Sequence, residues 1–148
     1  MKIVVLKFGG TSVGNIKRIK NVANIINSYH KKKYKLIVVS SAMSGVTNDL
    51  IRKSKEISEN FLPSEYDVLV SSGEQVACSL IAARLSHIGL KSRSWLSWQI
   101  PIITEGSHKN AKILSIYKKK ILDYLKKGGI PIVTGFQGID TDERIKTI

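Results

Sequence analysis

The feature that most constrains this chain is the alternation of short apolar runs with segments of helical periodicity. Residues 2–6 (KIVVL) and 35–40 (KLIVVS) are rich in β-branched side chains, as expected of strands covered on both faces. Similar runs occupy residues 101–104 and 130–135, with a weaker candidate at 92–96. This alternation predicts an α/β protein, a three-layer αβα fold with a mostly parallel sheet.

Four segments between these runs predict helices. Residues 16–26 carry an apolar face, and residues 50–57 indicate a second, shorter helix. Residues 74–89 (EQVACSLIAARLSHIG) form the strongest pattern, which ends at Gly89. Residues 114–129 (LSIYKKKILDYLKKGG) predict a further amphipathic helix that two glycines terminate.

Two shorter patterns concern the ends of elements. Ser64 and Asp67 have the spacing of a capping box ahead of an apolar triplet. Near the end of the chain, residues 140–143 (DTDE) predict a turn that leads into a new strand with no helix after it.

The composition favours one packed, cytoplasmic domain. The chain has 148 residues, 43% of them hydrophobic, and no apolar run long enough for a membrane span or a secretory signal. One cysteine, Cys78, rules out an internal disulfide and cannot form a metal site by itself. Its apolar surroundings predict a buried, unreactive thiol.

The formal net charge of +13 raises the hypothesis of nucleic-acid binding. Lysine supplies most of this charge, and residues 30–35 (HKKKYK) and 117–121 (YKKKI) lie where helices are expected to end or face water. Lysines at helix C-termini are stabilised by the helix dipole. We therefore favour a solvated surface, with a nucleic-acid groove as the less favoured alternative.

Four polar or glycine-rich turns follow apolar segments, at residues 7–14, 40–48, 71–75 and 135–138. Ligands of open α/β sheets bind at the carboxyl ends of the strands, so these turns are expected to line one cleft.

The first turn, KFGGTSVG, has the chemistry of an anion site. Gly9 and Gly10 let backbone N–H groups approach an anion, the next helix adds its positive N-terminus, and Lys7 supplies a mobile charge. The spacing is neither that of a P-loop nor that of a dinucleotide fingerprint. A glycine-rich turn beside a solvated lysine is the equally simple alternative.

Six motifs in order make the chain resemble the aspartokinases of the amino-acid kinase superfamily, over nearly its whole length. They are KFGGTSVG, VVSSAMSGVTN, SSGEQV, WQ (98–99), NAKIL and IVTGFQG. The resemblance implies a carbamate kinase-like fold and ATP-dependent phosphorylation of the β-carboxylate of L-aspartate, on the route to lysine, threonine and methionine. ATP with Mg²⁺ is the implied cofactor, and no residue of this chain is expected to be a metal ligand.

The resemblance also implies roles for individual residues. Lys7 is expected to be the catalytic, phosphate-binding lysine. The phosphate and ATP contacts are Lys7, Phe8, Gly9, Gly10, Ser12 and Ser41, and the substrate contacts are Thr47, Glu74 and Phe136. From the residues alone, Thr47 is equally well a helix N-cap and Glu74 a carboxylate in the first turn of a helix. Among the histidines, His30 and His87 are expected at helix ends or on the surface, and His108 has a slight chance of a role in a substrate loop.

Aspartokinases continue past the equivalent of residue 148 with a second half that holds the nucleotide. We therefore expect residues 1–148 to be the N-terminal, substrate-binding portion of a truncated kinase domain that lacks this half and the regulatory domains. Such a chain is expected to be inactive or nearly so by itself, and to expose apolar surface that favours a homodimer or a separate C-terminal partner chain. The alternatives are a non-catalytic aspartate-binding or interaction remnant and, less favoured, a basic nucleic-acid-binding domain.

Overall fold

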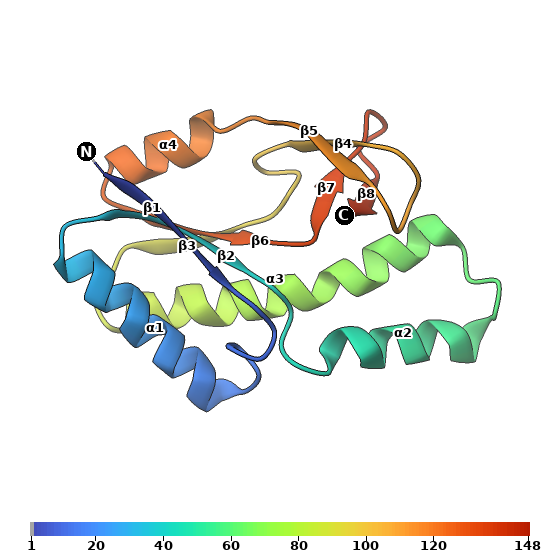
Figure 1. Cartoon of the computed structure of the whole chain (residues 1–148), viewed down its shortest axis with the longest axis horizontal. Helices are drawn as coiled ribbons and strands as arrows, with labels where there is room; N and C mark the ends of the chain where they lie inside the picture. The colour runs from blue at the N-terminus through green and yellow to red at the C-terminus, as the bar shows by residue number, and fades with distance from the viewer. Residues whose placement is uncertain (1) are drawn as a thin grey trace.

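The computed structural model describes residues 2–148 (Figure 1). Its elements, in chain order, are β1 (Ile3–Phe8), α1 (Ile16–Lys31), β2 (Lys35–Ser40), α2 (Val46–Ile57), α3 (Pro63–His87), β3 (Ser92–Trp95), β4 (Ile102–Glu105), β5 (Lys112–Ile116), α4 (Lys119–Lys126), β6 (Ile130–Thr134), β7 (Gln137–Ile139) and β8 (Ile145–Thr147).

The strands form two sheets. The main sheet has the order β1-β2-β6-β3, and all of its neighbouring strands are parallel. The second sheet has the order β5-β4-β7-β8, in which β4 pairs with β7 in parallel and the other two pairs are antiparallel. The predicted strand after the DTDE turn is confirmed as β8, and it pairs with β7.

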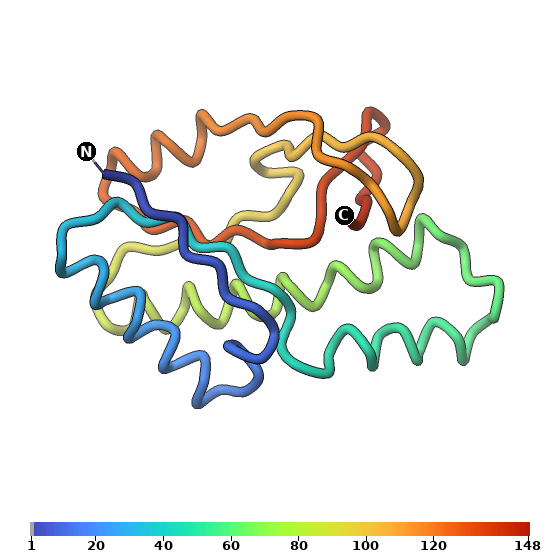
Figure 2. The backbone as a smooth tube through the Cα atoms, viewed as in Figure 1, coloured from blue at the N-terminus to red at the C-terminus, as the bar shows by residue number. Residues whose placement is uncertain are grey.

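Helices α1 and α3 cover one face of the main sheet, as the path of the chain shows (Figure 2). Strand β2 alternates accordingly: Leu36 and Val38 are buried in this core, whereas Ile37 and Val39 point to the other face. Helix α4 packs on that other face through Ile121, which lies in a second apolar cluster. Helices therefore lie on both sides of a parallel sheet, and the predicted αβα fold is confirmed.

Strand β1 departs from the expectation that both faces of the first strands are covered. It is the edge strand of the main sheet, and among residues 2–148 no helix or strand packs extensively against β1 on the face of the sheet that α4 covers. The side chains of Ile3 and Val5 are consequently 42% and 59% exposed. The expectation of uncovered apolar surface is thus confirmed at this edge.

The helix predicted over residues 114–129 is only half right. Residues 112–116 instead form β5, because their backbone pairs with β4 in the second sheet. The helix α4 begins at Lys119 and ends before Gly128, whose φ of +77° is a left-handed conformation that glycine adopts without strain.

Helix α3 begins earlier than the sequence indicated, and the predicted capping box is wrong. Leu62 is the N-cap residue and Pro63 occupies the first turn, so Ser64 lies inside the helix. The carboxylate of Asp67 is fully buried and accepts a hydrogen bond from Thr147 Oγ1 at 2.6 Å, which ties β8 to α3.

By length and composition alone, α3 also qualifies as a helix that could cross a bilayer, contrary to the expectation that no segment is long and apolar enough. Half of the qualifying stretch is buried within the fold, however, and α3 packs against α1, α2 and the main sheet. The helix therefore has the position of a core helix.

Candidate functional site

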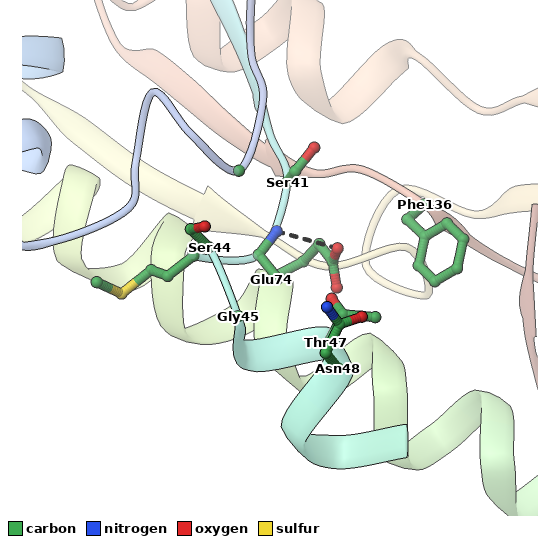
Figure 3. A pocket seen from close by; sticks show the side chains of 10 residues that line it. Ser41, Ser44, Gly45, Thr47, Asn48, Glu74 and Phe136 are labelled. Carbon is green, nitrogen blue, oxygen red and sulfur yellow. Dashed lines mark hydrogen bonds between the residues drawn. The ribbon is translucent and has the colours of Figure 1, made fainter. Parts of the chain in front are cut away.

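A cavity of about 320 Å³ lies at the carboxyl edge of the main sheet, where β1, β2 and β6 end (Figure 3). This volume is at the lower end of the range for small-molecule sites. Its lining residues are Gly10, Ser41, Ala42, Met43, Ser44, Gly45, Thr47, Asn48, Glu74 and Phe136. Three of the four predicted turns thus converge on one cleft, together with helices α2 and α3.

The turn after β1 packs closely on the turn after β2. Ser12 N donates to Gly9 O at 3.0 Å and closes the first turn. A Cβ atom at Gly10 would lie 3.1 Å from Ala42 O, so the backbones could approach less closely with any other residue there. Helix α1 begins at Ile16, capped by Asn15, and Arg18 Nη1 in its first turn donates to Thr11 O, next to the glycine pair, at 2.7 Å.

The N-terminus of helix α2, which carries a partial positive charge, forms part of the cavity wall. Gly45 is its N-cap residue at a φ of +84°, and Thr47 and Asn48 lie in its first turn. The alternative interpretation of Thr47 as the N-cap is therefore wrong. The unpaired N–H groups at the start of this helix create a partial positive charge at the wall of the cavity.

Glu74 brings a buried carboxylate to the same cavity. It lies in the middle of α3 and is only 2% exposed, so the alternative of a first-turn carboxylate is wrong. Its Oε1 atom accepts a hydrogen bond from Ala42 N at 3.0 Å, whereas Oε2 has no partner within residues 2–148. Burial raises the pKa of Glu74 above its usual 4.5, although the hydrogen bond from Ala42 partly opposes this effect.

The predicted turn at residues 71–75 is also wrong, since these residues belong to α3. Gly73 faces the turn after β2: a Cβ atom there would lie 2.8 Å from the Ala42 side chain and 3.1 Å from Val46 Cγ1. The glycine therefore serves close helix packing, which carries Glu74 into the cavity one residue later.

A second, apolar groove of about 650 Å³ lies on the open face of the main sheet. Lys7 lines it, with its side chain on the same face as Ile3 and Val5. Ser41 and Phe136 line both the groove and the smaller cavity, so the two spaces adjoin at these residues. Phe136 adopts a φ of +63°, a strained conformation for an aromatic residue and one found at functional sites.

The structure thus brings most of the predicted site residues together. Gly10, Ser41, Thr47, Glu74 and Phe136 line the cavity. Lys7 reaches only the groove, and neither space is lined by Phe8, Gly9 or Ser12. Phe8 is instead part of the core, with its carbonyl accepting from Ser41 N at 3.0 Å.

The structure adds Ala42, Met43, Ser44, Gly45 and Asn48, which the sequence analysis did not single out. All five belong to the motif SSAMSGVTN, so their proximity to Thr47 was the available signal.

The remaining predicted residues lie away from the cavity. His30 and His87 are in the last turns of α1 and α3, as expected. His108 Nδ1 lies 2.7 Å from the buried Asp67 Oδ2, so its side chain holds the loop before β5 against α3. Cys78 is fully buried, and burial raises the pKa of its thiol to about 12.

Comparison with known proteins places this geometry in a family. The profile of the amino acid kinase family matches residues 2–147. The aspartokinase of Rickettsia conorii is 44% identical over 151 aligned positions, which cover 100% of this chain and 38% of that protein. The crystal structure of aspartate kinase from Synechocystis has a TM-score of 0.79 at 33% identity, covering 98% of this chain and 23% of that one.

A second solved structure, aspartokinase III of E. coli in complex with aspartate and ADP, has a TM-score of 0.83 at 22% identity and covers 99% of this chain and 43% of that one. The chain therefore spans well under half the length of each of these three proteins. The resemblance inferred from the six motifs is confirmed, and the chain belongs to the amino acid kinase family.

Proposed function

We propose that this chain forms the aspartate-binding part of an aspartate kinase. The complete enzyme would transfer the γ-phosphoryl group of ATP to the β-carboxylate of L-aspartate and release 4-phospho-L-aspartate and ADP, a step in lysine, threonine and methionine biosynthesis. The curated relatives at about 44% identity are aspartokinases, which supports this substrate over that of another amino acid kinase.

The observation that carries the proposal is the orphaned oxygen of Glu74. A buried carboxylate atom without a hydrogen-bond donor is costly, and a ligand ammonium group would compensate it directly. The cavity offers this acceptor beside the N-terminus of α2, which favours a carboxylate. An α-amino acid carries both groups on one carbon atom, so the two sites together fit a zwitterion.

Residues around this pair would orient the substrate. Thr47 and Asn48 project from the first turn of α2 toward the Glu74 carboxylate (Figure 3). Their side chains can donate hydrogen bonds to a carboxylate. We assign to them, and to the backbone at Phe136, the positioning of aspartate.

The phosphate side of the site would be the groove that carries Lys7. Ser41 and Phe136 separate it from the cavity, so a β-carboxylate there would face a phosphoryl group on the Lys7 side. A Cβ atom at Gly9 would meet no atom within 4 Å, and Gly9 is not among the positive-φ residues. Folding therefore does not require glycine at this position, which is consistent with space for a ligand.

The chemistry needs no general base in this chain. The β-carboxylate is ionised at neutral pH, and one of its oxygens attacks the γ-phosphorus while the bond to the ADP oxygen breaks. Catalysis consists of aligning two anions and neutralising the charge that moves. Lys7 would stabilise the phosphoryl oxygens.

Mg²⁺ would accompany ATP in the complete enzyme, and its ligands have to come from the protein or the phosphates. Residues 2–148 bring no group of three or more His, Cys, Asp or Glu side chains together. Because kinase Mg²⁺ is held largely by phosphate oxygens and few carboxylates, we assign it no ligand in this chain.

We further propose that the part of the relatives outside the alignment supplies the nucleotide-binding half, since the chain covers 38% of the Rickettsia conorii protein. The chain by itself would then bind aspartate but turn over slowly, unless a homodimer or a separate partner chain completes the site. A cytoplasmic location is consistent with this role.

The test is calorimetric titration of the chain with aspartate and with succinate, which lacks the ammonium group. We expect aspartate to bind and succinate to bind far more weakly. Glu74→Gln should remove this preference, because it removes the charge that reads the ammonium group. Glu56→Gln, on the exposed face of α2, is the matched control and should leave binding unchanged.

Trapping of aspartyl phosphate with hydroxylamine distinguishes the two forms of the proposal. Product that requires both ATP and Lys7 indicates a working kinase, and aspartate binding without product indicates a non-catalytic aspartate-binding remnant. Equal affinity for aspartate and succinate in the unmodified chain would refute the proposed substrate site.

A further inference from the structure

The charges of this protein are segregated along the chain. Residues 1–48 contain nine lysines and arginines and no aspartate or glutamate. The acidic residues begin at Asp49 and concentrate in α2, in the first half of α3 and in the turn between β7 and β8. Such asymmetry points to a one-sided field rather than an evenly solvated surface.

Tertiary structure collects the basic residues at the edge where the parallel strands begin. Lys2, Lys35 and Lys91 lie at the starts of β1, β2 and β3. Lys35 N donates to Lys2 O at 3.1 Å, and Ile130 N, at the start of β6, donates to Lys91 O at 2.8 Å. Their backbones therefore follow one another across the edge of the sheet.

The helices add further lysines because α1 and α4 run back to the same edge (Figure 1). Helix α1 ends in residues 31–33, three consecutive lysines, and α4 ends in Lys126 and Lys127. We call this set the amino edge: Lys2, Lys31, Lys32, Lys33, Lys35, Lys91, Lys126 and Lys127. It lies at the opposite end of the main sheet from the aspartate cavity.

These lysines keep their charge largely uncompensated. Lys35 Nζ donates to Leu125 O at 3.3 Å, and Lys91 Nζ donates to Lys127 O at 3.2 Å, both neutral acceptors. Lys2 and Lys32 lie over tyrosine rings. Across residues 2–148, the one carboxylate within ion-pair distance of the amino edge is Asp123, 3.9 Å from Lys126.

The helix dipole explains only part of this arrangement. Lysines in the last turns of α1 and α4 are favoured at the negative ends of these helices. Lys35 and Lys91 also donate to carbonyls at the end of α4, so the dipole of this helix favours them too, whereas Lys2 precedes β1 and makes no such contact among the described residues. The amino edge nevertheless holds eight lysines and, among the described residues, one carboxylate within ion-pair distance, so its excess of positive charge suits an anionic partner.

The shape of the edge identifies the kind of anion. A recess of about 210 Å³ opens between the end of α1, the start of β2 and the turn before β6. It is lined by His30, Lys33, Tyr34, Lys35, Leu36, Gly128, Gly129 and Ile130. Tyr29 and Tyr34 lie beside it with ring centroids 6.1 Å apart and are only partly buried.

We propose that the amino edge binds the phosphate backbone of single-stranded nucleic acid. A row of lysines matches repeating phosphates, and Tyr29 and Tyr34, partly buried among them, could stack with an unpaired base that displaces the lysine over either ring. An anionic membrane surface is the competing partner, and the vesicle arm of the test distinguishes it. The edge is distinct from the aspartate cavity, so this binding does not depend on the proposed kinase chemistry.

The test is fluorescence anisotropy with a labelled single-stranded RNA of about 20 nucleotides, titrated between about 50 and about 200 mM salt. The edge variant is Lys31→Gln/Lys33→Gln. The matched control, Lys55→Gln/Lys112→Gln, removes the same charge from α2 and β5. Thermal melting of all three proteins verifies that they are folded.

We expect binding whose affinity falls with salt, and a salt slope about 1.4 smaller in the edge variant, since each lost phosphate contact removes about 0.7. The control should keep the slope of the unmodified protein. Equal slopes in the two variants, no binding at about 150 mM salt, or binding to phosphatidylserine vesicles without binding to RNA would each overturn the proposal.

Discussion

The carboxylate of Glu74 accepts a hydrogen bond from the backbone N–H of Ala42 at 3.0 Å, which joins the middle of α3 to the turn after β2. This bond fixes one carboxylate oxygen in place and directs the other, partnerless oxygen to the cavity. A structural contact and a binding group thus occupy the two oxygens of one side chain.

Replacing Glu74 by Gln should stabilise the ligand-free protein at neutral pH. Burial raises the pKa of Glu74, so the folded state holds this proton more tightly than the unfolded chain. Protonated Glu74 stabilises the fold fully below its pKa in the unfolded chain, 4.5, and this stabilisation is lost as the pH rises through its higher pKa in the folded state. Denaturant unfolding from about pH 4 to about pH 8 should show the variant's advantage growing with pH.

The same substitution should weaken aspartate binding, because a buried charge pair is lost. Removal of one partner of such a pair costs about 2–5 kcal/mol, at least roughly thirtyfold in affinity. Aspartate affinity of the unmodified chain should rise with pH over the range in which Glu74 ionises. A Glu74→Gln protein that is less stable than the unmodified chain at every pH would show that burying the ionised carboxylate does not destabilise the fold.

Gly73→Ala should destabilise the fold, although alanine is the better helix former. At a solvent-exposed position within a helix, the substitution would raise the free energy of unfolding by about 1 kcal/mol. Here the new methyl group would lie 2.8 Å from the Ala42 side chain, and we expect a loss of about 1–3 kcal/mol in the free energy of unfolding. Ser79→Ala on the exposed part of α3 is the control and should change stability little. A higher free energy of unfolding in the Gly73→Ala variant would show that the turn after β2 shifts to make room for the methyl group.

Lys7→Ala should spare stability and impair phosphate binding. The side chain is exposed, so unfolding should change by no more than about 0.5 kcal/mol. If Lys7 contacts the phosphoryl group, the affinity for tripolyphosphate, measured by calorimetry, should fall by roughly tenfold to a hundredfold. Lys118 lines the same groove, so Lys118→Ala serves as the control. Equal losses in both variants would mean that the groove attracts anions only through its general charge.

Cys78 should resist alkylation in the folded protein. Burial raises its thiol pKa to about 12, so the reactive thiolate is scarce at pH 8 and the reagent has no path to it. Iodoacetamide labelling, followed by mass spectrometry, should proceed only at the rate of unfolding and become fast in denaturant. Rapid labelling without denaturant would show that α3 opens locally.

Much of the fold follows from local sequence patterns. The apolar runs of β2 and β6 and the periodicity of α1 predict these elements because burial on a sheet or a helix face requires those spacings. The sequence could not predict β5, whose apolar residues match a helix as well as a strand, since pairing with β4 decides between them.

Of the candidate site, Gly10, Ser41, Thr47, Glu74 and Phe136 were predicted from motifs that resemble aspartokinases, and the structure brings them to one cavity. The environment of Glu74 was not predictable, because residues 71–75 have the composition of a turn. Only the contact between Gly73 and Ala42 shows why a glycine stands inside α3.

The sequence by itself determined the αβα architecture, three of the four predicted turns and the family. The tertiary structure alone decided which face of β1 stays open, which oxygen of Glu74 remains unpaired and where the lysines gather. The physical reason is that periodicity records only whether a side chain is buried. Its partner, and the edge of the sheet at which it lies, depend on segments far away in the chain.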